Sequence, residues 1–406
     1  PRPPPSMVGP MTTAPPARPA EPGRPRLLNG ATVHGPAGIR RLRHRAEIPL
    51  LWASAAVSAA AVAAWLALVT WLVAVPSPTG PAKEVRELLV GGSAMTGAQV
   101  LLAIPLLPLV VWGARALLYA RMRASSVQMS PTQFPEGYRM VVEAAERFGL
   151  RRVPDAYVVL GNGRINAFAA GHGFRRFVAV YSDLFEVGGS ARDPEALRFV
   201  ISHEVGHLAA GHISFWRVLV FQIVYSVPLL GKALSRAQEY TADNHGYDAA
   251  PAGVPGVMGL LGAGKYLGAQ VNLHATADRA VHERGFWVHV VQWTSTHPTL
   301  TWRSHALRDR SRPGRLMVRP KTAWYPPVSP LGRERSRAWP TPADVLARMD
   351  EMDGGGPRVP GAEEQFGRYP GLRYAVGRDE LRLADPTPAG RTRPDPAESG
   401  PHEPVD

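Results

Sequence analysis

Residues 201–212 read ISHEVGHLAAGH, and this stretch decides which fold and which site the chain can have. On a helix, four residues turn through about 400°, so the side chains of His203 and His207 lie about 40° apart on one face. Two imidazoles in this arrangement can bind one Zn²⁺ ion, and Glu204 between them can reach a water on that metal. The stretch therefore predicts a zinc site with a built-in base.

A helix is expected around this motif because a strong start signal lies upstream. Asp193-Pro194-Glu195 combines a capping side chain, a proline at the first helical position and an acid in the first turn. We expect this helix to run on through His212.

A third ligand is needed, because a catalytic zinc usually takes three protein groups and leaves one position for water. His212 is one candidate, but Ile213 stands where a metzincin would have histidine. Glu239 on a second expected helix is the better candidate. Asp243, one turn further on the same face, could accept a hydrogen bond from a ligand histidine. The alternative is that Glu239 and Asp243 form a solvated helix face near Arg236.

Composition divides the chain into parts. Of 41 prolines, 11 lie in residues 1–47 and 16 in residues 312–406. Such Pro-, Arg- and Gly-rich ends bury too little apolar surface to offset the entropy of ordering. We therefore expect a disordered basic arm at 1–47, a mostly disordered tail at 312–406, and a soluble body at 130–311.

The charge and the residue types exclude several functions. The net charge is +13, but the arginines are dispersed or flank apolar segments, without a basic stripe interleaved with aromatic residues. Nucleic acid is therefore not an expected partner. The chain has no cysteine, so any metal must be held by His, Asp or Glu. No G-x-S-x-G motif supports serine chemistry.

Two apolar runs predict transmembrane helices. Ile48–Val75 holds 28 consecutive uncharged residues, more than the roughly 30 Å hydrocarbon layer requires. It starts late, is too long for a signal peptide and lacks a small-x-small cleavage site. A second uncharged run, Leu88–Ala114, contains Pro105 and Pro108. We expect spans at about 48–75 and 97–119, and the lipid bilayer is an expected partner.

Basic flanks predict the orientation. Eight arginines lie in the first 47 residues, and Arg115, Arg121 and Arg123 follow the second run. The positive-inside rule then gives a multi-pass protein of the cell membrane with its soluble body on the cytoplasmic side.

A third apolar stretch, residues 218–231, is short for a span. It is either a buried core helix or a re-entrant, membrane-resting segment.

The soluble body reads as α+β. Pro135–Gly149 has helical periodicity and ends on glycine. Strands are expected at 156–160, 165–169 and 177–181. The Asn162-Gly163 pair predicts that the first two of these strands form a hairpin.

Four motifs in this order resemble the integral-membrane metallopeptidases typified by HtpX and the zinc CAAX prenyl protease. They are Asn166-Ala167-Phe168-Ala169, His203-Glu204-x-x-His207, Glu239-x-x-x-Asp243 preceded by Ser235-Arg236, and Ser295-Thr296-His297-Pro298. Together they extend over about residues 130–310. The resemblance implies a zincin-like, gluzincin-type body that binds one Zn²⁺ per chain on His203, His207 and Glu239, with Glu204 as general base.

The resemblance also implies weaker assignments. Asn166, Ala167 and Phe168 fall where the family's edge strand meets the substrate backbone. His297 and Arg303 match positions that face the peptide or the developing oxyanion.

The implied activity is HtpX-like zinc endopeptidase activity on misfolded or membrane proteins, so polypeptides are the expected substrates. Two alternatives remain: a sensor-type membrane metallopeptidase that cleaves one regulator, and a catalytically silent scaffold that holds zinc. Glu204 argues against the scaffold. One departure from the family is that only 31 residues separate His207 from Glu239, whereas HtpX-like proteins often place two membrane helices there.

Overall fold

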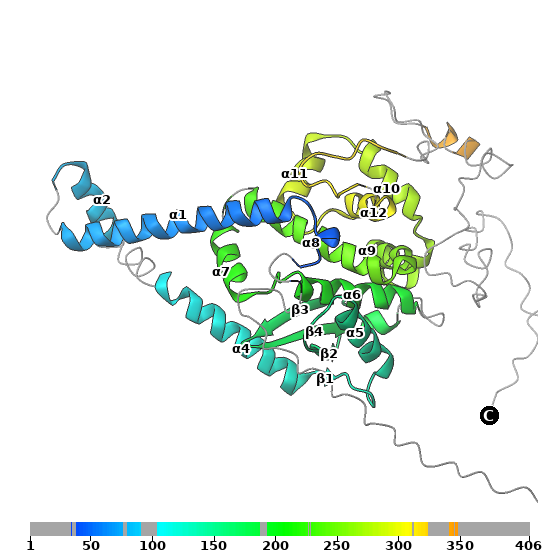
Figure 1. Cartoon of the computed structure of the whole chain (residues 1–406). Helices are drawn as coiled ribbons and strands as arrows, with labels where there is room; N and C mark the ends of the chain where they lie inside the picture. Colours follow the sequence, from blue (N-terminus) through cyan, green and yellow to red (C-terminus); the bar gives the residue numbers. More distant parts are fainter. Residues whose placement is uncertain are drawn as a thin grey trace, which may run out of the picture. The chain divides into compact units, whose positions relative to one another are not determined.

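The computed structural model describes residues 34, 38–75, 79–90, 104–186, 193–225, 227, 229–310, 312–323, 341–344 and 346–347. These residues form helices around one small mixed sheet, so the expected α+β class is confirmed (Figure 1). The helices are α1 (Glu47–Ala74), α2 (Pro81–Val90), α4 (Leu107–Ser125), α5 (Pro135–Arg147), α6 (Pro194–Ala209), α7 (Phe215–Val224), α8 (Leu230–Ala249), α9 (Val254–Leu267), α10 (Leu273–His282), α11 (Phe286–Thr294) and α12 (Leu300–Arg308).

The sheet contains β1 (Val127–Gln128), β2 (Asp155–Val159), β3 (Ala167–His172) and β4 (Arg175–Tyr181), in the order β1-β2-β4-β3. β2 and β4 are parallel, and the other two pairs are antiparallel. The predicted hairpin between 156–160 and 165–169 is therefore wrong, because β4 lies between these strands. The hairpin is formed by β3 and β4 instead, and within the described sheet β3 is an edge strand.

Burial explains this strand order. Residues 176–180 of β4 are all buried, which suits a strand with partners on both sides, whereas β3 is mostly half-buried. Asn162 and Gly163 do reverse the chain, with φ angles of 48° and 82°. A turn signal of this kind predicts a reversal, but it does not choose the partner of the following strand.

Helices cover both faces of the sheet. Successive side chains of a strand point to opposite faces, so Val178 and Val180 lie on one face and Phe177 on the other. The two valines belong to the main core together with residues of α5 and α6. The Phe177 ring stacks on Tyr119 of α4, with 5.3 Å between ring centroids. The sheet is therefore a layer between α4 and the pair α5 and α6.

Replacing Phe177 with alanine is expected to lower the free energy of unfolding by about 3–5 kcal/mol, because a buried ring is lost and the cavity closes only partly. Phe177 is 0% exposed and lies against the rings of Tyr119, Tyr157 and Phe168. Denaturant unfolding in detergent measures the change. Phe174→Ala is the control, since Phe174 is 60% exposed in the β3–β4 turn and should cost less than about 0.5 kcal/mol. Equal losses would contradict the assigned packing.

The first apolar helix begins inside the folded body. Four buried positions of α1 recur every three or four residues and form one stripe: Glu47, Leu51, Ser54 and Ser58. This stripe faces α7 and α8, the helices that α1 contacts. The remainder of α1 is largely exposed.

The structure corrects the expectation that all of residues 1–47 form a disordered arm. Leu42 and His44 are buried, and the His44 N–H donates to the Thr241 hydroxyl of α8 over 2.9 Å. The Asn244 amide of the same helix donates to the Leu42 carbonyl over 2.7 Å. Composition misses such a segment because hydrogen bonds hold it in place, with few apolar side chains. Residues 1–33 and 35–37 lie outside the described residues.

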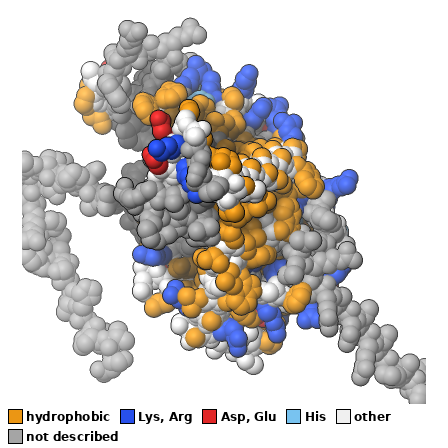
Figure 2. Space-filling view, turned by 90° about the vertical axis from the view of Figure 1, so that its left-hand side faces the viewer, with side chains coloured by type: hydrophobic (Ala, Val, Ile, Leu, Met, Phe, Trp, Pro, Cys, Tyr) orange, Lys and Arg blue, Asp and Glu red, His pale blue; other side chains and the backbone are white. Residues whose placement is uncertain are grey.

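Two helices are long and apolar enough to cross a membrane: α1, and the run Ile104–Ser125 that ends in α4. Only 6% and 0% of their most apolar windows are buried, so neither is the core helix of a soluble protein. Figure 2 shows hydrophobic side chains gathered over one face of the molecule. α1 matches the predicted span 48–75 closely, whereas the span predicted at 97–119 is described only from residue 104. In the apolar stretch 218–231, α7 is too short for a span and is half-buried against α1.

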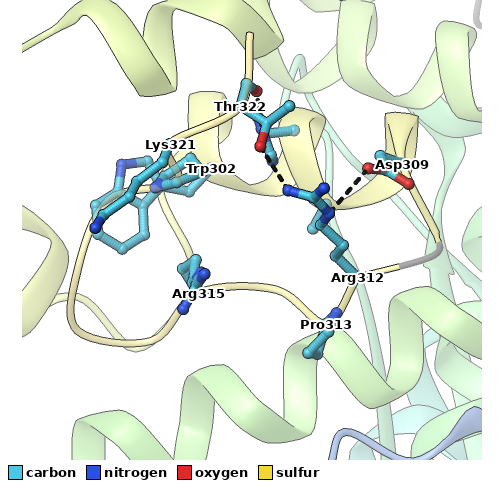
Figure 3. Close-up of a pocket in the computed structure, with 10 residues that line it drawn as sticks. Trp302, Asp309, Arg312, Pro313, Arg315, Lys321 and Thr322 are labelled. Atoms are coloured by element: carbon cyan, nitrogen blue, oxygen red, sulfur yellow. Dashed lines mark hydrogen bonds and ion pairs between the residues drawn. The ribbon is translucent and has the colours of Figure 1, made fainter.

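The folded body continues beyond residue 311. Arg312 donates to the Thr322 hydroxyl over 2.5 Å and pairs with Asp309 at 3.8 Å, which folds the segment 312–323 back onto α12 (Figure 3). His305 of α12 bonds through Nε2 to the Thr322 carbonyl at 2.8 Å. Beyond residue 323, only residues 341–344 and 346–347 of the predicted tail are among the described residues.

Candidate metal centre

The helix that carries the H-E-x-x-H motif begins as the sequence predicts. The Asp193 carboxylate accepts a hydrogen bond from the Ala196 N–H over 2.8 Å and caps the first turn of α6. The predicted end is wrong by three residues, because α6 ends at Ala209 and not at His212. Gly211 has a φ of 77°, a left-handed conformation that ends helices. The chain changes direction there, so His212 lies outside α6.

Two glycines allow α6 and α8 to approach closely. A Cβ atom on Gly206 of α6 would lie 2.6 Å from the Cβ of His245 on α8. A Cβ atom on Gly246 of α8 would lie 2.9 Å from the Phe199 ring on α6. Real Cβ atoms do not come so close, so the absence of side chains here lets the two helices bring Glu239 beside the histidines.

Three potential ligand groups form a small triangle. His203 Nε2 lies 3.2 Å from His207 Nε2, and each of these nitrogens lies 3.6 Å from a different carboxylate oxygen of Glu239. A tetrahedral zinc with ligands at about 2.0–2.1 Å requires about 3.3 Å between ligand atoms. The observed spacings are close to this value, so His203, His207 and Glu239 fit one zinc ion.

A hydrogen bond on the side opposite the triangle orients the ring of His203. Its Nδ1 lies 3.0 Å from Asp243 Oδ1, so the nitrogen opposite the triangle donates to a buried carboxylate. Arg303 in turn donates to both oxygens of Asp243, over 2.8 Å from Nε and 2.5 Å from Nη2. This is the orienting role that the sequence suggested for Asp243. Arg303 thus supports the Asp243 carboxylate behind His203, and the substrate-facing role that the resemblance implied for it stays a prediction.

The ring of His207 is also held, by the residue that was the other candidate ligand. His207 Nδ1 lies 2.8 Å from His212 Nδ1. His212 therefore contacts a ligand and does not belong to the triangle. On its far side, His212 Nε2 lies 3.1 Å from a carboxylate oxygen of Glu47. Sequence reasoning missed Glu47, because no local pattern links two residues that lie 165 positions apart.

The electrostatics of the two ligand histidines differ. Burial alone would lower the pKa of His203, but its hydrogen bonds to the Asp243 and Glu239 carboxylates outweigh it and raise this pKa to about 9, so zinc binding must displace a proton from His203. Burial lowers the pKa of His207 well below its usual value, and it also lowers the pKa of His212. Both rings are therefore neutral, and a neutral imidazole is the form that binds a metal. Burial alone would raise the pKa of Glu239, but its hydrogen bond to His203 and the nearby histidines outweigh it and hold this pKa well below its usual range. Glu239 is therefore an anion.

Glu204 has the properties of a general base. Its carboxyl group is buried, and burial raises its pKa to about 7, which is suited to proton transfer at neutral pH. The backbone N–H of Ala169 on β3 bonds to this carboxyl group. Glu204 thus lies on α6 between its two histidines and contacts the edge strand of the sheet.

Of the remaining predicted site residues, His297 lies next to the ligand triangle, whereas the side chains of Asn166 and Phe168 do not contact it in the described structure. His297 Nε2 lies 3.5 Å from Glu239, on a side chain that is 65% exposed. Asn166 has an exposed side chain, and its carbonyl accepts the Tyr181 N–H of β4 over 3.0 Å. The Phe168 ring lies 6.3 Å from Phe177, on the side of the sheet that α4 covers. The part of β3 that reaches the site is the backbone of Ala169.

The open edge of β3 follows from this pairing. In an antiparallel pair, successive residues alternate between facing the partner strand and facing away. Because Asn166 faces β4, the backbone groups of Ala167 and Ala169 face the open edge. The bond from the Ala169 N–H to Glu204 agrees with this alternation.

Comparison with known proteins gave one match. No curated protein and no solved structure matches the chain. Residues 131–311, which include β2, β3 and β4, both ligand-bearing helices and α12, match the sequence model of peptidase family M48. M48 enzymes are zinc-dependent, and the group His203, His207 and Glu239 could bind such an ion. The match supports the assignment of this part of the chain to the M48 metallopeptidases.

Proposed function

We propose that the protein is a membrane-anchored zinc endopeptidase of the HtpX type, with a zincin-like body. The observation that carries the proposal is the juxtaposition of the ligand triangle, the buried base Glu204 and the open edge of β3. A site that held zinc only for structure would have no use for a buried carboxyl group with a pKa near 7 at this position.

The open strand edge favours extended peptide segments as substrates. An added strand would pair with the backbone groups of Ala167 and with the Ala169 carbonyl, since the Ala169 N–H already bonds to Glu204. Backbone pairing of this kind gives affinity with little dependence on side-chain sequence. Such recognition suits unfolded polypeptides. The strand would pass beside Glu204 and within reach of the exposed His297 ring.

Zinc on the triangle would polarise the scissile carbonyl and acidify the attacking water. Residues of the chain transfer the proton, orient the ligands and stabilise the developing charge. Glu204 accepts a proton from the attacking water and passes it to the leaving amine nitrogen. Asp243 and Arg303 keep the His203 ring in the tautomer that presents Nε2 to the metal. His297, exposed and next to Glu239, is available to donate to the developing oxyanion.

The two apolar helices support a membrane location for this site. Arginines precede α1 and lie in α4 from its middle to its C-terminal end, so the positive-inside rule favours the cytoplasmic side of the cell membrane for the body. Membrane proteins and misfolded polypeptides are then the accessible substrates.

Metal removal tests the proposal. The full chain, purified in detergent, is expected to bind one zinc, to cleave unfolded casein, to stop cleaving when a chelator removes the metal, and to resume when zinc is restored. Cleavage that survives metal removal would contradict the proposal. Zinc binding without cleavage of any unfolded substrate would favour the scaffold, or the sensor-type enzyme if one dedicated regulator is cut.

A further inference from the structure

We propose that Glu47, in the first turn of α1, is a positioning residue for the metal ligand His207 and acts on it through His212. This inference rests on the proposed zinc site and extends it to the first membrane helix. It starts from the unequal support of the two ligand histidines. His203 has a carboxylate directly behind its ring, whereas His207 has a second histidine there.

Hydrogen-bond direction makes the three groups one relay. If His207 binds the metal through Nε2, its proton must be on Nδ1, which then donates to His212 Nδ1. His212 can accept there only if its own proton is on Nε2. That nitrogen faces the Glu47 carboxylate at 3.1 Å, and a carboxylate can only accept. Glu47 therefore selects the His212 tautomer that in turn selects the metal-binding tautomer of His207.

The surroundings of Glu47 suit this role. The residue is 0% exposed, and the Thr241 hydroxyl of α8 donates to its other oxygen over 2.6 Å. Arg43 pairs with Glu47, and Arg217 of α7 lies 3.5 Å from it. A buried carboxylate needs such partners to remain charged. They fix its oxygens at the start of the helix and leave one of them directed at His212.

The relay has a consequence for the architecture. One metal ligand is oriented by Asp243, from the helix that also supplies Glu239. The other is oriented by the first turn of the apolar helix that is expected to enter the membrane. Tight zinc binding thus requires that α1 packs correctly against α7 and α8.

The test measures the zinc dissociation constant of the full, detergent-purified chain by competition with a chelator of known affinity. His212→Leu removes the acceptor and should weaken zinc binding about 10- to 100-fold, the usual cost of losing such a partner. His212→Asn keeps a carbonyl oxygen as acceptor and should restore most of the affinity. Glu47→Gln should weaken binding roughly tenfold. Asn244→Ala is the matched control, because it releases the same pre-helix segment outside the relay and should leave the affinity unchanged.

Double variants separate the relay from a general loss of structure. If Glu47 acts through His212, Glu47→Gln should have no further effect on zinc affinity in the His212→Leu background. Should Glu47→Gln fail to fold, Glu47→Asp takes its place, because it keeps the charge beside Arg43 and withdraws the carboxylate from His212.

Three results would overturn the relay: unchanged zinc affinity in folded His212→Leu, an equal loss in the control Asn244→Ala, or a full additional loss when Glu47→Gln is added to His212→Leu. In each case wild type still binds zinc, so the proposed function stands. A wild-type chain that binds no zinc would overturn the proposed function and the relay together.

Discussion

Glu204→Gln is expected to lower the rate of casein cleavage about 10²- to 10⁴-fold while one zinc remains bound per chain. The rate falls because glutamine cannot take the proton of the attacking water. The metal stays because Glu204 is not one of the three groups of the triangle. Glutamine also preserves the shape of the side chain, so the core around α6 should remain intact.

This experiment compares steady-state cleavage and zinc content in the same preparations. Glu146→Gln is the matched control, since it makes the same chemical change on an exposed position of α5 and should leave both quantities unaltered. Equal cleavage by wild type and Glu204→Gln would mean that another group is the base or that a contaminant cuts casein. Loss of zinc from Glu204→Gln would instead mean that Glu204 itself is a ligand.

The second large effect is expected from Glu239→Gln. Zinc binding of about 10–16 kcal/mol, shared among four ligand positions, gives about 2.5–4 kcal/mol for each, so the affinity should fall about 60- to 700-fold. A neutral amide oxygen replaces an anion whose two oxygens lie 3.6 Å from the histidine nitrogens. Casein cleavage should be lost at zinc concentrations that saturate wild type, and excess zinc should recover only part of it.

The control for this change lies on the same helix. Asp248→Asn removes a carboxylate from the last turn of α8, where Asp248 pairs with Arg147, and it should not alter zinc binding. Unchanged zinc affinity in Glu239→Gln would show that the third ligand lies elsewhere, and His212 would become the first candidate.

The ligand-bearing helices could be predicted because helical periodicity is local. The spacing of His203 and His207 and the cap at Asp193 are readable within one segment. The interval from Glu239 to Asp243 likewise puts both carboxylates on one helix face, and the structure directs that face at the histidines. Residue spacing cannot predict the close approach of α8 to α6. This approach depends on Gly206 packing against His245 and on Gly246 packing against Phe199.

Pairings between distant segments could not be predicted. The Asn162-Gly163 turn indicates a reversal, but the choice between β3 and β4 as the neighbour of β2 depends on burial of both faces of β4. The sequence did not predict the packing of residues 38–46 or the burial of Glu47, because both depend on contacts with distant segments. A charged residue at the edge of an apolar run is interpreted as a membrane flank until its partners are known, which for Glu47 are His212 and residues of α7 and α8.

The groups that build the metal site are far apart along the chain. Glu47 comes first, His203 and His207 follow, then Glu239 and Asp243, and Arg303 comes last. During synthesis, a nascent chain that ends after α6 therefore carries the H-E-x-x-H motif without its third ligand or either partner of His203. Only when α12 has been made can all these groups meet. The order of translation thus keeps the ribosome-bound chain from assembling the fully supported metal site until α12, and with it most of the folded body, has been made.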